Sequence, residues 1–189
     1  MLAVGARGMG ALTAQSPDCG ALAPELVQAV TLGSIDVVSV RLWLDRYVSD
    51  ADHANVFSRF KALQGSGATF FMLDQLQKGA ESALWAGQAP QGSVIASDFY
   101  NASAIAELSD QQIVDCLMRD LLPMAQPAFA EARVVDQEVR RYPGSVSLFS
   151  PGSFSKRPPL ETSLAPVVCA GDWVRMGERE HGAKGLCQE

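Results

Sequence analysis

The strongest constraint on the fold is a run of alternating side chains at residues 35–44. One set of alternate positions is entirely apolar: Val38, Val40, Leu42 and Leu44. The other set is mixed: Val37, Ser39, Arg41 and Trp43. Because the side chains of a β-strand point alternately to opposite faces, this period of two predicts a strand with one buried face. Such a strand needs neighbours, so the chain is expected to build a sheet.

Four later segments carry strand patterns of their own: residues 55–60, 68–73, 93–99 and 133–141. The turn Gly65-Ser66-Gly67 lies between the first two, which predicts a hairpin-like pair. In the last of them, Val135 and Val139 are expected to share one face of the strand.

One helix is predicted by the residues that would cap it. Ser109 and Gln112 have the spacing of a capping box, in which each side chain satisfies the backbone N–H of the other residue. An apolar face follows, formed by Ile113, Leu117 and Leu121 with Val114, Met118 and Leu122 beside them. Pro123 and Pro127 are expected to end or break this helix.

The remaining elements are short. Residues 2–4 and 167–170 are interpreted as short buried strands near the two chain ends, and small helices are expected near Met9 and from Pro24. Residues 75–91 are polar and contain glycine, so an irregular excursion is expected there. Several strands with one strong helix between them predict an α+β fold with a mostly antiparallel sheet.

Composition excludes several classes of function. The net charge is -6 and Lys and Arg do not cluster, which argues against a nucleic-acid partner. No apolar run has the length of a membrane span, and the first residues lack the pattern of a signal peptide. With 48% hydrophobic and 19% charged residues, the chain has the composition of a globular protein.

The metal-ligating residue types are few and scattered. The four cysteines lie far apart and form no CxxC pair, and there are only two histidines, so no metal site is predicted. The cysteines are interpreted as small buried or half-buried side chains in a reducing compartment. The sequence contains no GxSxG motif, and neither histidine lies beside a plausible nucleophile motif. Both observations argue against hydrolytic chemistry of the Ser-His-Asp or Cys-His kind.

The candidate binding residues lie near the C-terminus. A proline-rich segment from Arg157 leads into an apolar stretch that ends in Gly171-Asp172. Glycine allows a ligand to approach the backbone closely, and a carboxylate after a strand can accept hydrogen bonds from sugar or ribityl hydroxyls. Further on, Gly182 and Ala183 begin a predicted helix, whose free N–H groups would favour an anionic partner. Taken alone, Gly171-Asp172 is a weak signal that a plain turn also explains, and an ordinary helix start is the favoured explanation of Gly182-Ala183.

The chain also lacks the usual dinucleotide fingerprint. No GxGxxG follows a strand, and the glycines at residues 5–10 have a different spacing with no acidic residue at the expected distance.

Taken together in their order, these segments carry a family resemblance. They are residues 2–9, 40–46, 55–58, 92–95, 108–110, 157–162 and 170–173. In this order and spacing the chain resembles the C-terminal half of the FAD-dependent amine oxidoreductases, especially the carotenoid desaturase-like branch (relatives of phytoene and zeta-carotene desaturase). The resemblance spans nearly the whole chain, and residues 157–185 are its most specific part.

This resemblance implies a cofactor, a reaction and a set of contacts. The family binds FAD in a Rossmann-like domain and passes hydride from an apolar substrate carbon to the flavin. Gly171 and Asp172 match the family's FAD contact on the last strand, Gly182 and Ala183 match the helix start near the flavin ring, and Trp173 is placed to flank the cofactor. No residue is assigned as catalytic, and no metal is implied.

The resemblance also implies a division of the chain. Residues 1–10 would end a strand of the FAD domain, 11–160 would form the substrate-binding α+β domain, and 161–189 would return to an incomplete FAD domain. The chain is accordingly expected to be a truncated part of an FAD-dependent oxidoreductase that acts on a carotenoid-like polyene or an amine. The alternative is a non-catalytic binding or interaction domain on the same scaffold.

The resemblance leaves several properties open. For the parent protein it implies an enzyme, but for this chain alone it does not decide between catalysis and binding. The expected partner is a hydrophobic small molecule, with peripheral membrane contact allowed and the oligomeric state open. The compartment would be a plastid in a photosynthetic eukaryote, and otherwise the cytoplasm or a membrane surface.

Overall fold

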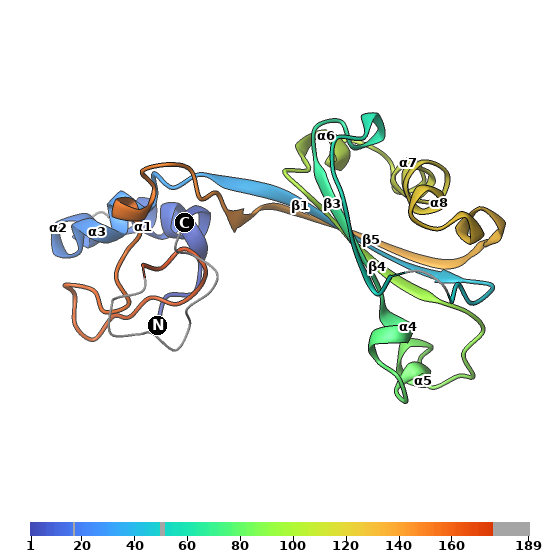
Figure 1. Ribbon diagram of the computed structural model, residues 1–189. Coiled ribbons are helices and arrows are strands. Elements are labelled where there is room, and N and C mark those ends of the chain that lie inside the picture. Colours follow the sequence, from blue (N-terminus) through green and yellow to red (C-terminus); the bar gives the residue numbers. More distant parts are fainter. Residues whose placement is uncertain (17, 50–51, 176–189) are drawn as a thin grey trace. The chain divides into compact units, whose positions relative to one another are not determined.

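The computed structural model describes residues 1–16, 18–49 and 52–175. Contacts divide the chain into two compact units. Unit 1 comprises Met1–Ile35 with Gly144–Glu189, and unit 2 comprises Asp36–Pro143. Helices and an antiparallel sheet occur together, which confirms the α+β fold class (Figure 1).

The sheet has five strands in the order β2-β3-β4-β1-β5 (Figure 1). Their bounds are Ser34–Leu44 for β1, Ala54–Phe57 for β2, Gly67–Met72 for β3, Val94–Tyr100 for β4 and Val134–Ser147 for β5. Strands β2 and β3, β3 and β4, and β4 and β1 pair antiparallel. The predicted pairing of the segments around residues 55–60 and 68–73 is therefore confirmed, with a 3-10 turn at Lys61–Leu63 between them.

Strand β1 has the two faces that its sequence predicts. The four alternate apolar side chains are buried: Val38, Val40, Leu42 and Leu44. They join the same core as Phe70 of β3 and Phe99 of β4. On the opposite face Ser39 and Trp43 are half-buried and Arg41 is exposed. One face therefore belongs to the core, and the other is available for a site.

Strand β5 is longer and less regular than predicted. It has 14 residues beside the 11 of β1, and hydrogen bonds join the strands at both ends, from Asp45 to Arg133 and from Leu148 to Gly33. The additional residues of β5 must therefore be accommodated as bulges. A bulge inverts the alternation, so Val134 and Val139 both pack against the core although their positions differ by an odd number, which would place them on opposite faces of a regular strand.

The prediction that Val135 shares a face with Val139 is consequently wrong. Val135 is 50% exposed, whereas Val139 packs against the core.

A helical segment covers the buried face of the sheet (Figure 1). It runs through α7 (Asp110–Asp115), a π-helical stretch (Cys116–Leu121) and α8 (Leu122–Ala125). The capping box at Ser109 is confirmed: its hydroxyl accepts the Gln112 N–H (3.2 Å), and the Gln112 side chain accepts the Ser109 N–H (2.9 Å).

The prolines interrupt this helix as expected. Pro123 falls in the first turn of α8, where its missing N–H leaves no bond unmade. The π-helical stretch directly before it changes the hydrogen-bond spacing. Pro127 then begins a 3-10 helix, Pro127–Glu131, whose Phe129 packs edge-on against Phe70 at 5.9 Å between ring centroids.

Three short helices, α4, α5 and α6, also belong to the described part of unit 2. The expected excursion at residues 75–91 contains two short helices, α4 (Leu73–Leu76) and α5 (Glu81–Leu84). A further short helix, α6 (Ser103–Ala106), precedes α7 and contributes the buried Ile105.

Unit 1 has a smaller core of its own. Its helices are α1 (Gly5–Gln15), α2 (Asp18–Leu22) and α3 (Pro24–Ala29), and a 3-10 turn occurs at Phe154–Lys156. Pro24 occupies the first turn of α3, as predicted. Helix α1 begins at Gly5, so the predicted start near Met9 is too late in the sequence. The core is formed by Ala6, Met9, Ala23, Leu26, Ala29, Leu32, Cys169, Trp173 and Val174.

The expected strand at residues 167–170 is reduced to single bridges. Val168 pairs antiparallel with Glu161, and Cys169 pairs in parallel with Leu2. The prediction was right about where the backbone pairs and wrong about the length of the ladder.

In the part of the chain that the structure describes, no helix has the length and apolar character needed to cross a membrane.

Candidate functional site

The candidate site in unit 1 begins with a short parallel backbone pair. The Leu2 N–H donates to the Val168 carbonyl (2.7 Å), and the Ala170 N–H donates to the Leu2 carbonyl (2.8 Å). Segments from the two ends of the described chain therefore run side by side in the same direction.

Each of these segments is followed by a glycine. Helix α1 begins at Gly5, three residues after Leu2, and Gly171-Asp172 follows Cys169. Because parallel segments have their carboxyl ends at the same edge, the start of α1 and the Gly171-Asp172 turn both follow that edge. Ligands of α/β proteins bind at the carboxyl ends of parallel strands, and helix N-termini favour anions.

The turn at Gly171 requires glycine. Its φ is +121°, and a Cβ there would lie 2.9 Å from Cδ1 of Trp173. Asp172 is exposed, and one carboxylate oxygen accepts the Ser147 N–H at 3.1 Å. The carboxylate thus ties this turn to the end of β5 and keeps a second oxygen for another partner.

Trp173 supports the turn from within the core. Its side chain is 1% exposed, and its Nε1 donates to the Ala170 carbonyl at 2.8 Å. The expectation that Trp173 flanks a cofactor stays a prediction. The other two predicted contacts, Gly182 and Ala183, lie outside the described residues.

Unit 2 has a polar cavity of about 320 Å³ on the second face of the sheet. Its lining residues come from β1, β4 and β5: Ser39, Val40, Arg41, Ala96, Asp98, Glu138, Arg140 and Tyr142. The Ser39 hydroxyl donates to the Asp98 carboxylate, and Arg140 is paired with Glu138. Arg140 and Glu138 therefore neutralise each other, and the cavity also presents one further cation, Arg41, and one further carboxylate, Asp98.

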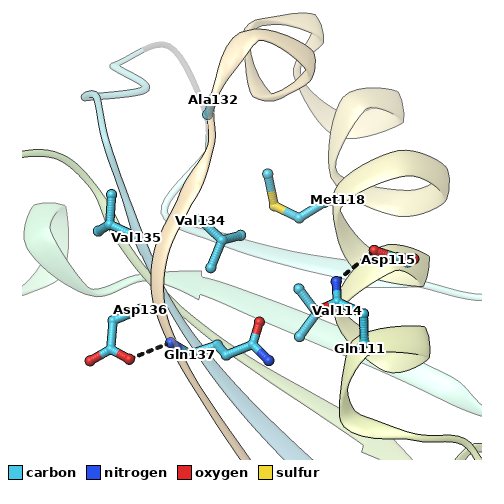
Figure 2. A pocket seen from close by; sticks show the side chains of 9 residues that line it. All are labelled: Gln111, Val114, Asp115, Met118, Ala132, Val134, Val135, Asp136 and Gln137. Carbon is cyan, nitrogen blue, oxygen red and sulfur yellow. Dashed lines mark hydrogen bonds between the residues drawn. The ribbon is translucent and has the colours of Figure 1, made fainter.

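A larger cavity, of about 420 Å³, opens between α7 and β5 (Figure 2). Val114 and Met118 on the helical side face Val134 on the strand. Gln111 also belongs to α7, and its side-chain N–H donates to the Asp115 carboxylate at 2.9 Å. Sequence reasoning did not identify this cavity, because it assigned these apolar side chains to the core.

A third cavity, of about 340 Å³, lies beside two tryptophans. The Trp43 Nε1 donates to the Leu84 carbonyl at 2.7 Å, whereas the Trp85 Nε1 is buried without a partner. Asp136 of β5 also lines this cavity. Trp85 was missed because it lies in a polar segment that predicts only a loop. Its one sequence signal is a large aromatic residue among small and polar neighbours.

The described thiols are unsuited to nucleophilic chemistry. Burial and, secondly, the charge of Asp120 raise the pKa of Cys116 to about 11, and burial raises the pKa of Cys169, with Glu25 adding to the effect. A thiol with a raised pKa holds its proton at neutral pH and is a poor nucleophile. Both are buried, as predicted for structural cysteines.

Comparisons with known proteins match the chain to solved structures alone. No family model matches the chain, and no curated protein matches it. A crystal structure from Exiguobacterium sp. 255-15, provisionally named as a protoporphyrinogen oxidase, matches with a TM-score of 0.47 and 14% sequence identity. The match covers 88% of this chain and 35% of that protein. At this identity and TM-score, the likeness assigns neither a family nor an activity to the chain.

Proposed function

We propose that the chain is the C-terminal part of an FAD-dependent oxidoreductase that takes hydride from a hydrophobic substrate, a carotenoid-like polyene or an amine. The observation that carries the proposal is the parallel pairing of Leu2 with Cys169. This pairing brings the start of α1 and the Gly171-Asp172 turn to one edge, which the resemblance assigns to the flavin. The proposed division is an FAD-domain part at residues 1–10 and 161–189 around a substrate domain at 11–160.

The residues of this edge fit a cofactor with phosphate and hydroxyl groups. The first N–H groups of α1 have no partners within the helix and favour negative charge. The second carboxylate oxygen of Asp172 can accept a hydrogen bond from a ribityl hydroxyl, and Gly171 leaves room for close approach. Gly182 and Ala183 are proposed to lie near the flavin ring. FAD, when bound, would supply the hydride acceptor, and the chain's residues would bind and orient it.

Between the two substrate classes, the tryptophan cavity favours an amine. An ammonium group is attracted by the face of an indole and by a carboxylate. Trp43, Trp85 and Asp136 supply both kinds of contact in one cavity. A polyene would make no use of the carboxylate.

One observation favours the alternative, a binding domain on the same scaffold without redox function. The Asp172 carboxylate already accepts the Ser147 N–H, and Trp173 is enclosed in the core of unit 1. Both residues therefore have a structural role that is independent of any cofactor.

The test is flavin retention by the complete gene product that contains this chain. The wild type should purify with flavin absorbance. Asp172→Asn keeps an acceptor for Ser147 but removes the charge, and we expect it to retain flavin about tenfold more weakly, which corresponds to about 1.4 kcal/mol. Asp52→Asn changes an exposed carboxylate in unit 2 and should retain flavin like the wild type.

Two outcomes would contradict the proposal. A flavin-free wild-type protein that binds no added FAD would favour the binding domain. Equal retention by wild type and Asp172→Asn would remove Asp172 from the cofactor site.

A further inference from the structure

The polar cavity on the second face of the sheet contains one matched pair of charges and two further charges. The matched pair is Arg140 and Glu138, where Arg140 Nε donates to the carboxylate at 2.8 Å. The further charges are Arg41 of β1 and Asp98 of β4, which line the same cavity. Among the described residues, no ion pair of the structure includes either of them.

The register of β1 and β4 sets the distance between these two charges. Ser39 lies opposite Asp98, and Arg41 lies opposite Ala96. Arg41 and Asp98 are therefore diagonal neighbours on one face of the sheet, a relation that places Cα atoms about 7–8 Å apart. A small ligand between the two side chains can contact both.

The Asp98 carboxylate is oriented by one hydrogen bond and keeps one oxygen for another partner. The Ser39 hydroxyl donates to its Oδ1. On the other side of β4, Thr69 of β3 lies opposite Asp98, but its buried hydroxyl has no partner and so does not engage the carboxylate. Within the described part of the chain, no hydrogen bond to Oδ2 is recorded, and a carboxylate oxygen in this state accepts readily from an ammonium group.

Arg41 is oriented by an aromatic ring. Its guanidinium centre lies 6.0 Å from the ring centroid of Trp43, and this indole is held in turn by its bond to the Leu84 carbonyl at 2.7 Å. A cation–π contact uses none of the guanidinium N–H groups as hydrogen-bond donors. Because Arg41 is exposed, these donors can reach a ligand, and their planar fork matches the two oxygens of a carboxylate.

We propose that this cavity binds a small zwitterion of the amino-acid type, with its carboxylate on Arg41 and its ammonium group on Asp98. A ligand that carries only one charge would leave the opposite residue without a partner. The volume of about 320 Å³ lies within the range of small-molecule sites, roughly 300–1,000 Å³. Val40 and Ala96 also line the cavity and offer contact to a short apolar side chain.

This site goes beyond the proposed function. None of its lining residues is a proposed flavin contact, and none lines the tryptophan cavity. It is formed by strands of unit 2, and its test does not involve flavin.

The test is calorimetric titration of the 189-residue chain with L-leucine, isocaproate and isoamylamine. The second and third compounds keep the branched side chain of leucine, and each lacks one of its two charges. L-leucine should bind at least about tenfold more tightly than either analogue, because only the zwitterion engages both side chains.

Two variants assign the two contacts. Arg41→Gln should weaken L-leucine about tenfold, to the level of isoamylamine, because the carboxylate loses its partner. Asp98→Asn keeps an acceptor for Ser39 and should weaken L-leucine to the level of isocaproate. Arg119→Gln and Asp52→Asn are the matched controls. They change exposed charges that do not line the cavity and should keep the wild-type preference.

Three outcomes would overturn the proposal. Wild-type protein that binds no L-leucine at millimolar concentration would show that Arg41 and Asp98 neutralise each other directly in solution. Equal affinity for L-leucine and one of its analogues would mean that one charge is not read. Wild-type preference in both variants would place the ligand elsewhere. If circular dichroism shows that Asp98→Asn does not fold, Arg41→Gln, at an exposed position, decides alone.

Discussion

At the scale of single residues, the start of β4 shows how few groups fix the position of a strand. Asp74 is buried, and its carboxylate accepts the Ser93 hydroxyl (3.2 Å) and the Val94 N–H (3.1 Å). The Ser93 oxygen in turn accepts the Val48 N–H at 3.0 Å. A buried carboxylate is stable when such hydrogen bonds satisfy it, so this network specifies one arrangement of the strand end.

Gly92 lies directly before this network and admits no side chain. A Cβ there would lie 2.5 Å from the Arg46 nitrogen and 2.7 Å from the Arg46 carbonyl oxygen, and both atoms belong to the backbone. We expect Gly92→Ala to lower the free energy of unfolding by about 2–4 kcal/mol, because backbone strain is costly to relieve. Urea unfolding measures this change.

The matched control is Gly67→Ala in β3, where a Cβ would meet nothing within 4 Å. It should change stability by less than about 1 kcal/mol. Equal losses for the two variants would show that the contact at Gly92 relaxes without cost.

At the scale of elements, local patterns predicted what local chemistry decides. The alternation of β1 and the capping box at Ser109 act within a few residues, and the structure confirms both. The face of Val135 could not be predicted, because the bulges of β5 arise from its pairing with β1, which is distant in sequence. Alternation fixes a face only until the first bulge.

The candidate site shows the same limit. Glycine and aspartate marked the turn at residues 171–172, and the structure places an exposed carboxylate there. Its partner Ser147 is 25 residues away, and nothing in the sequence indicated this bond. Likewise, Arg157 belonged to a recognised proline-rich segment, but only packing shows that its charge is buried on Phe149.

The capping box of α7 makes a prediction at this scale. Ser109→Ala removes the acceptor of the Gln112 N–H, so we expect a loss of about 1 kcal/mol in the free energy of unfolding. Ser82→Ala, an exposed serine inside α5, should be close to neutral. Chemical denaturation of both variants checks this, and equal stabilities would mean that the cap contributes nothing.

At the scale of the whole molecule, two separate cores determine stability. The larger core, in unit 2, includes the three aromatic side chains Phe57, Phe70 and Phe129, with Phe57 stacked on Phe70 at 5.3 Å. The smaller core of unit 1 joins residues from both ends of the described chain around Trp173. Unit 2 is one continuous stretch of chain, whereas unit 1 needs two stretches.

This difference predicts that residues 36–143 fold as an isolated polypeptide. Their core is formed within one stretch, so the isolated unit should unfold in a single cooperative transition, followed by circular dichroism on heating. Phe70→Ala should abolish or strongly lower this transition, because it removes a fully buried ring. Val56→Ala, at a largely exposed position, should leave it nearly unchanged. A gradual, non-cooperative loss of signal in the wild-type unit would contradict the prediction.

The pairing of β1 with β5 has a genetic consequence. The chain enters residues 36–143 along one strand and returns along its neighbour, and a Cβ on Gly144 would lie only 3.0 Å from the Ser34 hydroxyl. A short turn could therefore join residue 35 to residue 144 directly. The intervening stretch has the layout of an insert that recombination can delete or replace in one event while the rest of the gene stays intact.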